Sequence, residues 1–418
     1  MAQLKDDCFA FGGALMPVAE ALALLGERLE PVVDTEQVPL AEALGRTLAE
    51  SLTSPRDVPP HDNSAVDGYA VHFSDLDAAA ETRLPITGRV AAGHPLDRAA
   101  EPGEAIRIFT GAPMPDGPDT VFMEEDCTPD GEHVVLPPGL KQGSNRRHAG
   151  EDVKAGDVVA ARGRRLRAQE VGVAASIGRT EVEVFRRLKT AVFSTGDEVR
   201  DPAEGASDGA IFDANRYSVM GLLADLGCAV TDLGILADDQ ATMQAALQAA
   251  ARDHDLLITS GGVSAGEEDH VKAAVEALGR IDFWRLAIKP GRPIALGQVG
   301  DVAFVGLPGN PVAAMVTFML IARPVILRLS GRANVEAQRY SVVAGFDYKK
   351  KAGRREWARV RLETGADGRP VAQKHHSSGA GILTSMVEAD GLVELGEDIE
   401  ALSAGTLVDF LPFDGVTH

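Results

Sequence analysis

The most informative stretch of the chain is residues 255–272, which read DLLITSGGVSAGEEDHVK. The apolar run at 256–258 predicts a buried strand, Gly261 and Gly262 predict a turn, and a helix is expected to begin near Asp269. A strand, a glycine turn and a helix in succession expose backbone N–H groups that bind anions. The same loop carries three carboxylates, which suit a cation, so the stretch predicts a phosphorylated ligand handled with a metal; they are Glu267, Glu268 and Asp269.

The composition is that of a globular protein with several domains. The chain has 418 residues, enough for roughly two to four domains, and 45% of them are hydrophobic. The formal net charge of −21 argues against nucleic acid and membrane surfaces as general partners, because both are anionic. An anionic small ligand is still allowed, but it needs a local basic pocket.

The cysteines and the apolar runs give mostly negative information. Cys8, Cys127 and Cys228 form no CxxC pair, so we expect inert or buried thiols and neither a disulfide framework nor a zinc site. No basic and apolar leader opens the chain, and we expect no apolar run close to the roughly 20 residues of a membrane span. These features predict a cytoplasmic protein.

Residues 187–330 alternate regularly between expected strands and expected helices. Strand-like runs at 190–195, 229–236 and 255–260 are each followed by a helical pattern, and a long helical pattern closes the region at 311–329. This alternation predicts an open α/β domain of three layers with a largely parallel sheet.

The regions before residue 187 and after residue 330 have different sequence patterns. The segment 16–53 reads as two helices, with Pro39 in a first helical turn. Short β-like runs between Gly/Pro turns predict a small β domain near the N-terminus, inserted into another domain, and a second β domain at the C-terminus. The predicted domains are 1–53 together with 154–186, 54–153, 187–335 and 336–418.

Three loops of the α/β region are expected at one edge of the sheet, because ligands of open α/β sheets bind at the carboxyl ends of the strands. They are STGDE (194–198), SGGVSAGEEDH (260–270) and LPGNP (307–311). Each has a purely structural alternative: Asp269 as a helix N-cap, Asn310 as a turn or cap residue, and Glu198 in a solvated turn. Their expected meeting at one edge favours a site.

The segment 289–293, KPGRP, supplies positive charge to this acidic chain. Arg285 and Lys289 are four residues apart in a β-like run, so we expect both on one face of a strand, and Arg292 follows in the turn. The alternative is a solvated basic edge strand, which protects sheets from aggregation.

The segment 62–70, DNSAVDGYA, opens the first β region. Asp67 and Gly68 are typical of a turn and Asp62 of an Asx-turn, so a structural corner has about equal weight with a chemical role. The histidines show no metal-ligand spacing and are expected on the surface or in the core; those considered are His61, His94, His148, His254, His375 and His376.

Together these motifs resemble the molybdopterin molybdenumtransferases, the MoeA family, which includes the C-terminal domain of gephyrin. The resemblance spans most of the chain in family order. It is carried by PPHDNSAVDGYAV (59–71), RIFTGAPMPDGPDTVFMEED (107–126), RRHAGEDVKAGD (146–157), STGDE (194–198), FDANRYSV (212–219), TSGGVSAGEEDHVK (259–272), LAIKPGRPIALG (286–297) and GLPGNPVAA (306–314).

The resemblance implies a reaction in which adenylylated molybdopterin and molybdate give molybdenum cofactor and AMP, with Mg²⁺. It implies four domains in an elongated homodimer, in which the discontinuous N-terminal domain serves dimerisation. The cleft would lie between the α/β domain of one subunit and the inserted β domain of the other. A molybdopterin adenylyltransferase is the protein partner that the resemblance suggests.

The resemblance also assigns roles to residues of this chain. Glu198 and Asp269 are the expected metal ligands. The expected catalytic residues are Asp62, Thr110, Asp152, Glu198, Asp238, Asp269 and Lys289. The expected substrate-binding residues are Ser260, Gly261, Gly262, Arg285, Arg292, Pro308, Gly309, Asn310 and Pro311.

Two departures and two alternative functions accompany the resemblance. Many members of the family have lysine where this chain has Arg285, which keeps the charge and changes its geometry. The segment HHSSGAGILTSM (375–386) departs from the usual glycine-serine spacing, so no site residue is assigned there. The alternatives are a molybdopterin adenylyltransferase, which the β regions disfavour, and a gephyrin-like scaffold without turnover.

Overall fold

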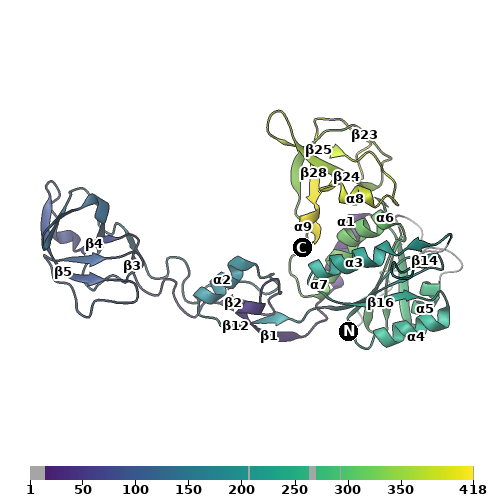
Figure 1. The fold of residues 1–418 in the computed structure, drawn as a ribbon, viewed down its shortest axis with the longest axis horizontal. Helices are drawn as coiled ribbons and strands as arrows, with labels where there is room; N and C mark the ends of the chain where they lie inside the picture. Colours follow the sequence, from purple (N-terminus) through teal and green to yellow (C-terminus); the bar gives the residue numbers. More distant parts are fainter. Residues whose placement is uncertain (1–14, 206–207, 263–269, 292, 418) are drawn as a thin grey trace.

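The molecule, a computed structural model, is elongated. A β-rich lobe at one end is joined through a narrow middle section to an α/β region and a C-terminal β region at the other end (Figure 1). The structure describes residues 15–205, 208–262, 270–291 and 293–417.

Residues 16–53 contain one α-helix, not two. Helix α1 (Val18–Arg28) contacts α7, but the residues after it form the strand β1, and Pro39 ends that strand. The expected second helix within 16–53 is therefore wrong. The other elements there are a single 3-10 turn (Leu40–Glu42) and β2 (Leu52–Thr53), while β1 spans Thr35–Pro39.

The middle section is built from two segments that are distant in the sequence. Strand β1 pairs antiparallel with β12, and β2 pairs antiparallel with β11, so the chain before 54 and the chain after 153 form common ladders. Helix α2 packs beside them. The later elements are β11 (Val158–Ala160), α2 (Ala168–Ser176) and β12 (Glu181–Phe185).

The segment between these halves forms the β-rich lobe, whose six-stranded sheet has the order β7-β4-β6-β5-β9-β8. Its two connections to the middle section run side by side: Val58 bridges Val153, and the Ser54 amide donates to the Asp157 carbonyl at 2.9 Å. The elements are β3 (Asn63–Ser64), β4 (Gly68–Val71), a 3-10 turn (Phe73–Asp75), β5 (Thr82–Val90), β6 (Ala105–Ile108), β7 (Thr120–Met123), a 3-10 turn (Glu124–Asp126), β8 (Thr128–Asp130), β9 (His133–Leu136) and β10 (Arg146–Arg147).

The α/β region holds a six-stranded sheet of order β16-β13-β17-β21-β20-β18, in which the first four strands are parallel. Strands β20 and β18 are antiparallel additions. The three-layer α/β fold with a largely parallel sheet is confirmed. The elements are β13 (Lys189–Thr195), β14 (Val199–Arg200), β15 (Ile211–Phe212), α3 (Ala214–Asp225), β16 (Ala229–Leu236), α4 (Gln240–Ala250), β17 (Leu256–Ser260), α5 (His270–Leu278), β18 (Gly279–Arg285), β20 (Pro293–Val299) and β21 (Val302–Leu307).

Alternation along β17 explains why both faces of this sheet are covered. Ile258 belongs to the apolar cluster under α3 and α6, whereas Leu257 belongs to the cluster under α4 and α5. Successive side chains of a strand point to opposite faces, so a strand between two helical layers is apolar throughout. All five residues of β17 are buried.

Within the described residues, one apolar helix is long enough to cross a membrane, which corrects the expectation from the sequence. It runs over Pro311–Leu329, and 83% of its apolar window is buried within the structure. It is a core helix that packs on the sheet and on α1. It consists of α6 (Pro311–Thr317), a π-helical segment (Phe318–Ala322) and α7 (Arg323–Leu329).

The C-terminal region is a small closed barrel, in which β24 pairs with both β25 and β26 and so joins the two ends of the sheet. Strand β19 (Ile288–Lys289), which comes from the α/β region, also pairs with β24. The elements are β22 (Tyr340–Ala344), β23 (Tyr348–Lys349), β24 (Arg355–Thr364), β25 (Pro370–Lys374), α8 (Thr384–Val387), β26 (Gly391–Leu395), β27 (Ala401–Leu402), β28 (Leu407–Pro412) and α9 (Phe413–Thr417).

Candidate functional site

The notable loops of the α/β region meet at one edge of its sheet. The parallel strands β13, β16, β17 and β21 end at Thr195, Leu236, Ser260 and Leu307, so the residues after them share the carboxyl edge. Glu198, Asp238, Gly261, Gly262 and the segment 308–311 follow these four ends. This is the crevice at which open α/β sheets bind ligands.

A side chain from α3 ties two of these loops together. The Asn215 Nδ2 group donates to Ser260 Oγ at 2.8 Å and to the Gly309 carbonyl at 2.7 Å. The Ser260 hydroxyl in turn lies 3.3 Å from the Pro308 carbonyl. Asn215 was absent from the expected site residues although it lies in the FDANRYSV motif, because only the fold brings α3 against these strand ends.

The glycine turn after β17 needs glycine for steric reasons. Gly261 and Gly262 have φ angles of +89° and +62°, in the left-handed region. A Cβ atom at Gly262 would lie 2.5 Å from Val271 Cγ2 and 2.7 Å from Thr195 Cγ2. The turn therefore packs its backbone closely against α5 and the end of β13.

Two carboxylates at this edge are exposed. Glu198 follows β13, and Asp238 follows β16, where the Thr195 hydroxyl contacts it at 3.4 Å. Carboxylate oxygens at a strand edge are the hard ligands that Mg²⁺ accepts, so the donor chemistry fits this ion. The third expected acid, Asp269, lies outside the described residues.

The loop before α6 has the geometry predicted for a helix start. Pro311 occupies the first helical position, and the Ala314 amide donates to the Asn310 carbonyl at 2.8 Å. The Asn310 side chain makes no capping hydrogen bond and is exposed. The Val312 amide donates to the Ala380 carbonyl at 3.0 Å, which connects this helix to the C-terminal barrel.

A buried arginine fixes the segment between Glu198 and α3. The guanidinium of Arg216 is 2% exposed and pairs with Asp201, Asp213 and Asp232. Burial alone would lower its pKa, but the bonds to these carboxylates outweigh burial and raise it. Arg216 therefore stays charged and holds the β14–β15 segment against α3.

The basic segment differs from its expected geometry. Arg285 ends β18, whereas Lys289 lies in β19 and pairs with the barrel strand β24, and the chain bends at Ala287. The expected single strand that carries both Arg285 and Lys289 is therefore wrong. Arg292 lies outside the described residues. The backbone after β18 nevertheless stays at the carboxyl edge, because β18 runs parallel to β21 through the antiparallel β20.

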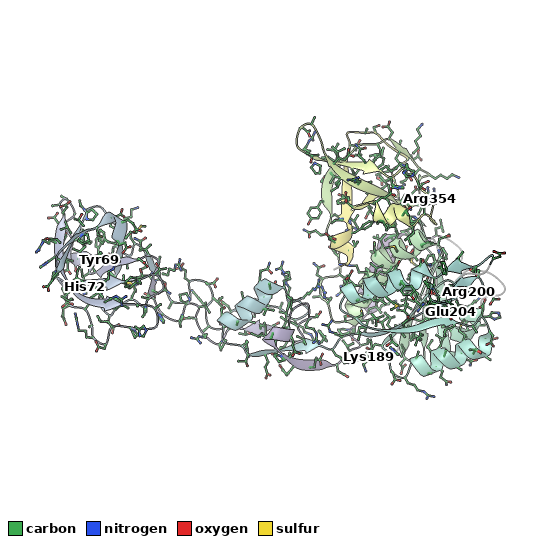
Figure 2. The ribbon with its side chains drawn as sticks, viewed as in Figure 1. Tyr69, His72, Lys189, Arg200, Glu204 and Arg354 are labelled. Carbon is green, nitrogen blue, oxygen red and sulfur yellow. The ribbon has the colours of Figure 1, made fainter. Side chains whose placement is uncertain are left out.

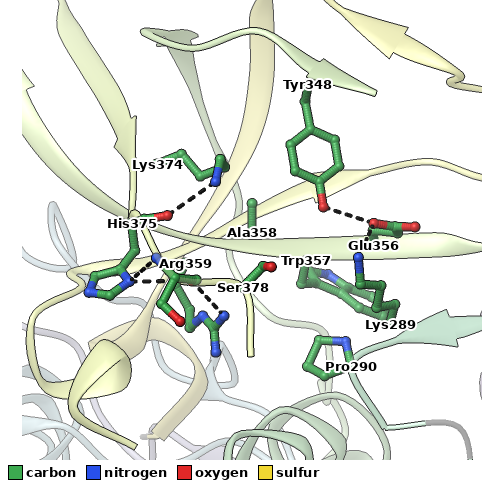
Figure 3. A pocket seen from close by; sticks show the side chains of 11 residues that line it. Lys289, Pro290, Tyr348, Glu356, Trp357, Ala358, Arg359, Lys374, His375 and Ser378 are labelled. Atoms are coloured by element: carbon green, nitrogen blue, oxygen red, sulfur yellow. Dashed lines mark hydrogen bonds and ion pairs between the residues drawn. The ribbon is translucent and has the colours of Figure 1, made fainter. Parts of the chain in front are cut away.

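Lys289 lines a pocket between the α/β region and the barrel (Figure 3). Three cationic side chains and one carboxylate line it, together with two serines, so the lining is net positive. The charged residues are Lys289, Arg359, Lys374 and Glu356, and the serines are Ser377 and Ser378.

The single carboxylate of this pocket is already shared by several donors. Glu356 is 2% exposed and accepts from Arg354 Nε at 2.7 Å and from the Tyr348 hydroxyl at 2.9 Å, while Lys289 Nζ lies 3.4 Å away. Burial and the bond to Glu356 raise the pKa of Tyr348 to about 12. Arg359 donates to the carbonyls of Ser377 and Gly379, and burial lowers its pKa. Lys289, with nearly half of its side chain exposed, is the cation best placed to meet a ligand.

A second cluster lies in the β-rich lobe. Asp62 accepts from Arg146 Nε at 2.6 Å and from the Ala149 amide at 2.8 Å, and His148 Nδ1 lies 3.5 Å away. Partial burial alone would raise the pKa of Asp62, but the bonds from Ala149 and Arg146 outweigh it and lower the pKa. The carboxylate is therefore ionised and joins the 146–149 loop to the start of β3.

Thr110 and Asp152 lie in the same lobe but contact other groups. The Thr110 amide and hydroxyl both donate to Asp67, at 2.7 and 2.8 Å, which lowers the pKa of Asp67. Asp152 is exposed, and its amide donates to the Val58 carbonyl at 3.0 Å. Asp67 was read from the sequence only as a turn residue.

The two clusters lie at opposite ends of one chain. Figure 2 shows Tyr69 of the β-rich lobe at one end and Arg200, two residues after Glu198, at the other. A single chain does not bring Asp62 and Lys289 into one pocket.

The described cysteines offer no nucleophile. Burial raises the pKa of Cys127 to about 11 and that of Cys228 to about 12, so both thiols are protonated at neutral pH. Cys8 lies outside the described residues.

Models of known protein families match three successive parts of the chain. The MoeA N-terminal region (domain I and II) matches residues 16–178, a probable molybdopterin binding domain matches 191–328, and the MoeA C-terminal region (domain IV) matches 341–413.

Individual relatives match over nearly the whole length. A molybdopterin molybdenumtransferase of Haemophilus influenzae is 38% identical over 96% of this chain and 99% of its own, and one from a Nostoc species is 33% identical over 92% and 91%. A crystal structure of a molybdopterin biosynthesis MoeA protein from Pyrococcus horikoshii aligns with a TM-score of 0.81 at 29% identity, over 96% of this chain and 100% of that one. The chain therefore belongs to the MoeA family of molybdopterin molybdenumtransferases.

Proposed function

We propose that this protein is a molybdopterin molybdenumtransferase, which converts adenylylated molybdopterin and molybdate into molybdenum cofactor and AMP. The observation that carries the proposal is the 38% identity over 96% of the chain with a protein of that name. The two β regions flanking the α/β sheet match MoeA regions as well, and no observation favours an adenylyltransferase or a scaffold.

The carboxyl edge of the α/β sheet suits the pterin phosphate and the pyrophosphate. The turn after β17 and the loop before α6 offer the backbone amides of Gly262, Gly309 and Asn310, whereas the Gly261 and Val312 amides already donate to carbonyl groups. Backbone amides of this kind bind phosphate oxygens well. Asn215 holds Ser260 and Gly309 at a fixed separation, so the two loops present their amides as one surface. In this assignment Ser260, Gly261, Gly262 and the segment 308–311 bind substrate.

Mg²⁺ fits beside this surface. Glu198 and Asp269 would hold the ion, with Asp238 adjacent, and the bound ion would neutralise charge on the pyrophosphate oxygens. The protein's own residues orient the pyrophosphate: Thr195 contacts Asp238 at the same edge, and the cluster around Arg216 fixes the backbone next to Glu198.

Molybdate suits the mouth of the pocket around Lys289, because the interior, about 20 Å³, has room for little more than one water molecule. An oxyanion requires positive charge and hydrogen-bond donors, and the pocket supplies Lys289, Lys374 and the serine hydroxyls with one carboxylate that is already occupied. This pocket opens beside the segment 289–291 that follows β18, so the oxyanion would enter next to the pterin site.

The active form would be a homodimer, because the β-rich lobe, which carries Asp62, Thr110 and Asp152, lies far from the α/β region of its own chain (Figure 1). The cleft would combine the β-rich lobe of one subunit with the α/β region of the other. We assign 1–53 with 154–186 to a discontinuous dimerisation domain, 54–153 to the inserted β domain, 187–335 to the α/β domain and 336–418 to the C-terminal β domain. The protein would act in the cytoplasm, where a molybdopterin adenylyltransferase would deliver its substrate.

The direct test incubates the purified chain with adenylylated molybdopterin, molybdate and Mg²⁺. We expect AMP release and cofactor formation that require all three. An adenylyltransferase would instead consume ATP in the presence of molybdopterin, and a scaffold would release no AMP. Either of those results would contradict the proposal.

The shared cleft is tested by complementation. Inactive Asp62→Ala chains mixed with inactive Lys289→Ala chains should regain activity in heterodimers, because one of the two clefts is then intact. The matched control mixes Asp62→Ala with Thr110→Ala, which both damage the β-rich lobe, so each of the two clefts carries one defect and no activity should return. Inactive Asp62/Lys289 heterodimers of verified composition would contradict a shared cleft.

A further inference from the structure

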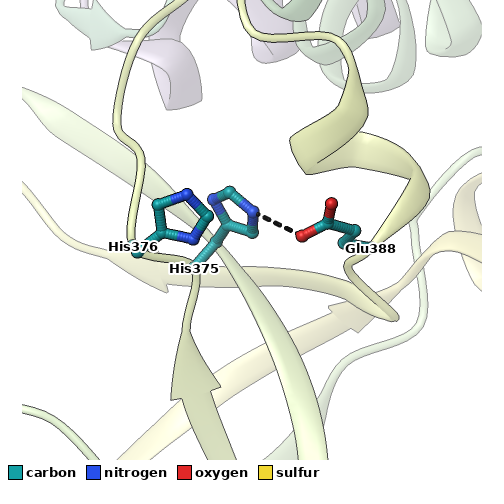
Figure 4. A group of neighbouring side chains, drawn as sticks. All are labelled: His375, His376 and Glu388. Atoms are coloured by element: carbon teal, nitrogen blue, oxygen red, sulfur yellow. Dashed lines mark hydrogen bonds and ion pairs between the residues drawn. The ribbon is translucent and has the colours of Figure 1, made fainter.

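Two consecutive histidines and a glutamate come together beside the barrel (Figure 4). His375 and His376 follow directly after β25, and Glu388 follows α8. The potential ligand atoms of the three side chains lie within 4.8 Å of one another. Among the described residues this is the only such group of three, and its two histidines were expected from the sequence to lie on the surface or in the core.

The geometry of the group is already partly organised. His375 Nε2 lies 3.0 Å from Glu388 Oε2, and the rings of His375 and His376 are 4.2 Å apart. The His375 side chain is 8% exposed, whereas the Glu388 side chain is 59% exposed. One ligand is therefore fixed by packing, and the other two have room to adjust.

The donor set selects the kind of ion. Two imidazoles and a carboxylate suit Zn²⁺ and its borderline neighbours such as Co²⁺, whereas Mg²⁺ and Ca²⁺ prefer oxygen ligands alone. Tetrahedral zinc with bonds of roughly 2.0–2.1 Å places its ligands about 3.3 Å apart, so modest movement of His376 and Glu388 closes the group around an ion. Water would complete the fourth position.

Binding has a local cost. His375 Nδ1 accepts from the Ser377 amide at 3.0 Å and lies 3.3 Å from the Ser377 carbonyl. A metal on Nε2 moves the ring proton to Nδ1, which then donates to that carbonyl, and the Ser377 amide gives up its acceptor. Lys374, whose Nζ binds the His375 carbonyl, adds a nearby positive charge. Both effects weaken the site without removing a ligand.

We propose that His375, His376 and Glu388 form a binding site for Zn²⁺ or a similar borderline divalent ion, separate from the Mg²⁺ site at the sheet edge. The ion would tie the loop after β25 to the end of α8. That loop carries the Ser377 and Gly379 carbonyls that hold Arg359, so the site would brace one wall of the pocket around Lys289.

The test uses the full chain without a histidine tag, stripped with a chelator and titrated calorimetrically with Zn²⁺. One Zn²⁺ per chain should bind, and His376→Ala and Glu388→Gln should each weaken binding at least tenfold. His94→Ala and Glu363→Gln, which remove an exposed histidine and an exposed carboxylate elsewhere, should leave binding unchanged. Co²⁺ should give the visible absorption of a tetrahedral site in the wild type and in both control variants, but not in His376→Ala.

Thermal melts make the result independent of catalysis. Zn²⁺ should raise the melting temperature of the wild type but not that of His376→Ala, because an ion that binds only the folded state stabilises it. Absence of saturable Zn²⁺ binding in the wild type would overturn the proposal, as would equal binding by His376→Ala in a protein that melts normally. AMP release plays no part in this readout, so a failure here leaves the proposed transferase activity untouched.

Discussion

The two carboxylate clusters of the molecule differ in how completely their side chains are already hydrogen-bonded. In the β-rich lobe, Asp62 accepts from Arg146 and the Ala149 amide, and Asp67 accepts twice from Thr110. At the sheet edge, Asp238 has one long contact with Thr195, and no hydrogen bond to the Glu198 side chain occurs within the described part of the chain. A carboxylate whose lone pairs are occupied holds structure together, whereas one whose lone pairs face water is available to a cation.

The largest effect should follow a change at the available carboxylates. Glu198→Gln keeps the size of the side chain and removes its charge, so we expect AMP release at limiting Mg²⁺ to fall by roughly 10²–10³-fold. The melting temperature should hardly change, because exposed surface substitutions alter stability by about 0.5 kcal/mol or less. Glu204→Gln, an exposed change on the same side of the molecule, is the control. A large loss of stability in Glu198→Gln would mean that the two clusters do not differ as described.

The second-largest effect should follow a substitution of Lys289, the exposed cation of the pocket beside the barrel. Lys289→Ala removes a charge-assisted contact to the oxyanion and should weaken molybdate binding by about tenfold to a hundredfold, or roughly 1.5–3 kcal/mol. Glu356 keeps Arg354 and Tyr348 as partners, so the fold should tolerate the change. Calorimetric titration measures the affinity, with Lys349→Ala as an exposed lysine control. Unchanged affinity would leave Lys289 as no more than a structural partner of Glu356.

Asp62, a carboxylate whose oxygens are already hydrogen-bonded, should show the opposite pattern, in which a substitution lowers stability. Asp62→Asn removes the charge that Arg146 pairs with and leaves one acceptor oxygen for two donors, because its NH2 group must face either Arg146 or the Ala149 amide. The β-rich lobe should therefore lose about 1–3 kcal/mol of unfolding free energy. Denaturant unfolding followed by near-ultraviolet circular dichroism measures this loss, and the exposed Asp116→Asn is the control. If Asp62→Asn melts normally but loses activity, Asp62 acts directly on substrate and the comparison must be revised.

The smallest effect concerns the pH dependence of stability and applies the same comparison to one more hydrogen-bonded carboxylate. Hydrogen bonds from Arg167 and Arg164 lower the pKa of Glu170 to about 2 from an ordinary value of 4.5. Its contribution to stability is complete above pH 4.5 and is lost as the pH falls toward 2. The difference in melting temperature between the wild type and Glu170→Gln should therefore be constant near neutral pH and shrink below about pH 4.5. A difference that persists unchanged in acid would rule out the charge as its origin.

Much of the fold was predictable because strand and helix periods alternate clearly after residue 187. That alternation also predicted the meeting of the loops after β13, β17 and β21, since parallel strands share a carboxyl edge. The second N-terminal helix was wrong because the leucine- and alanine-rich pattern after Pro39 favours a helix locally, while the bridges from Thr47 to Arg165 and from Leu48 to Val184 require an extended chain. Tertiary pairing overrides helix propensity at such places.

The parts of the site that the sequence did not predict all depend on contacts between distant elements. Asn215 meets Ser260 only because α3 lies over the strand ends, and Glu356 meets Lys289 only because β19 joins the barrel. The bend at Ala287, which separates Arg285 from Lys289, follows from the same change of sheet. No local spacing carries this information.

The side-by-side entry and exit of the β-rich lobe couple the folding of the two parts that it connects. The ladders β1–β12 and β2–β11 close around about 100 intervening residues, and closing an unstructured loop of that length costs about 4 kcal/mol in chain entropy. A folded lobe removes this cost, because the bridge between Val58 and Val153 already brings its two ends together. The folded lobe therefore holds together the two chain segments that form the middle section. A substitution that unfolds the lobe would also destabilise the ladders of the middle section, far from the mutated residue.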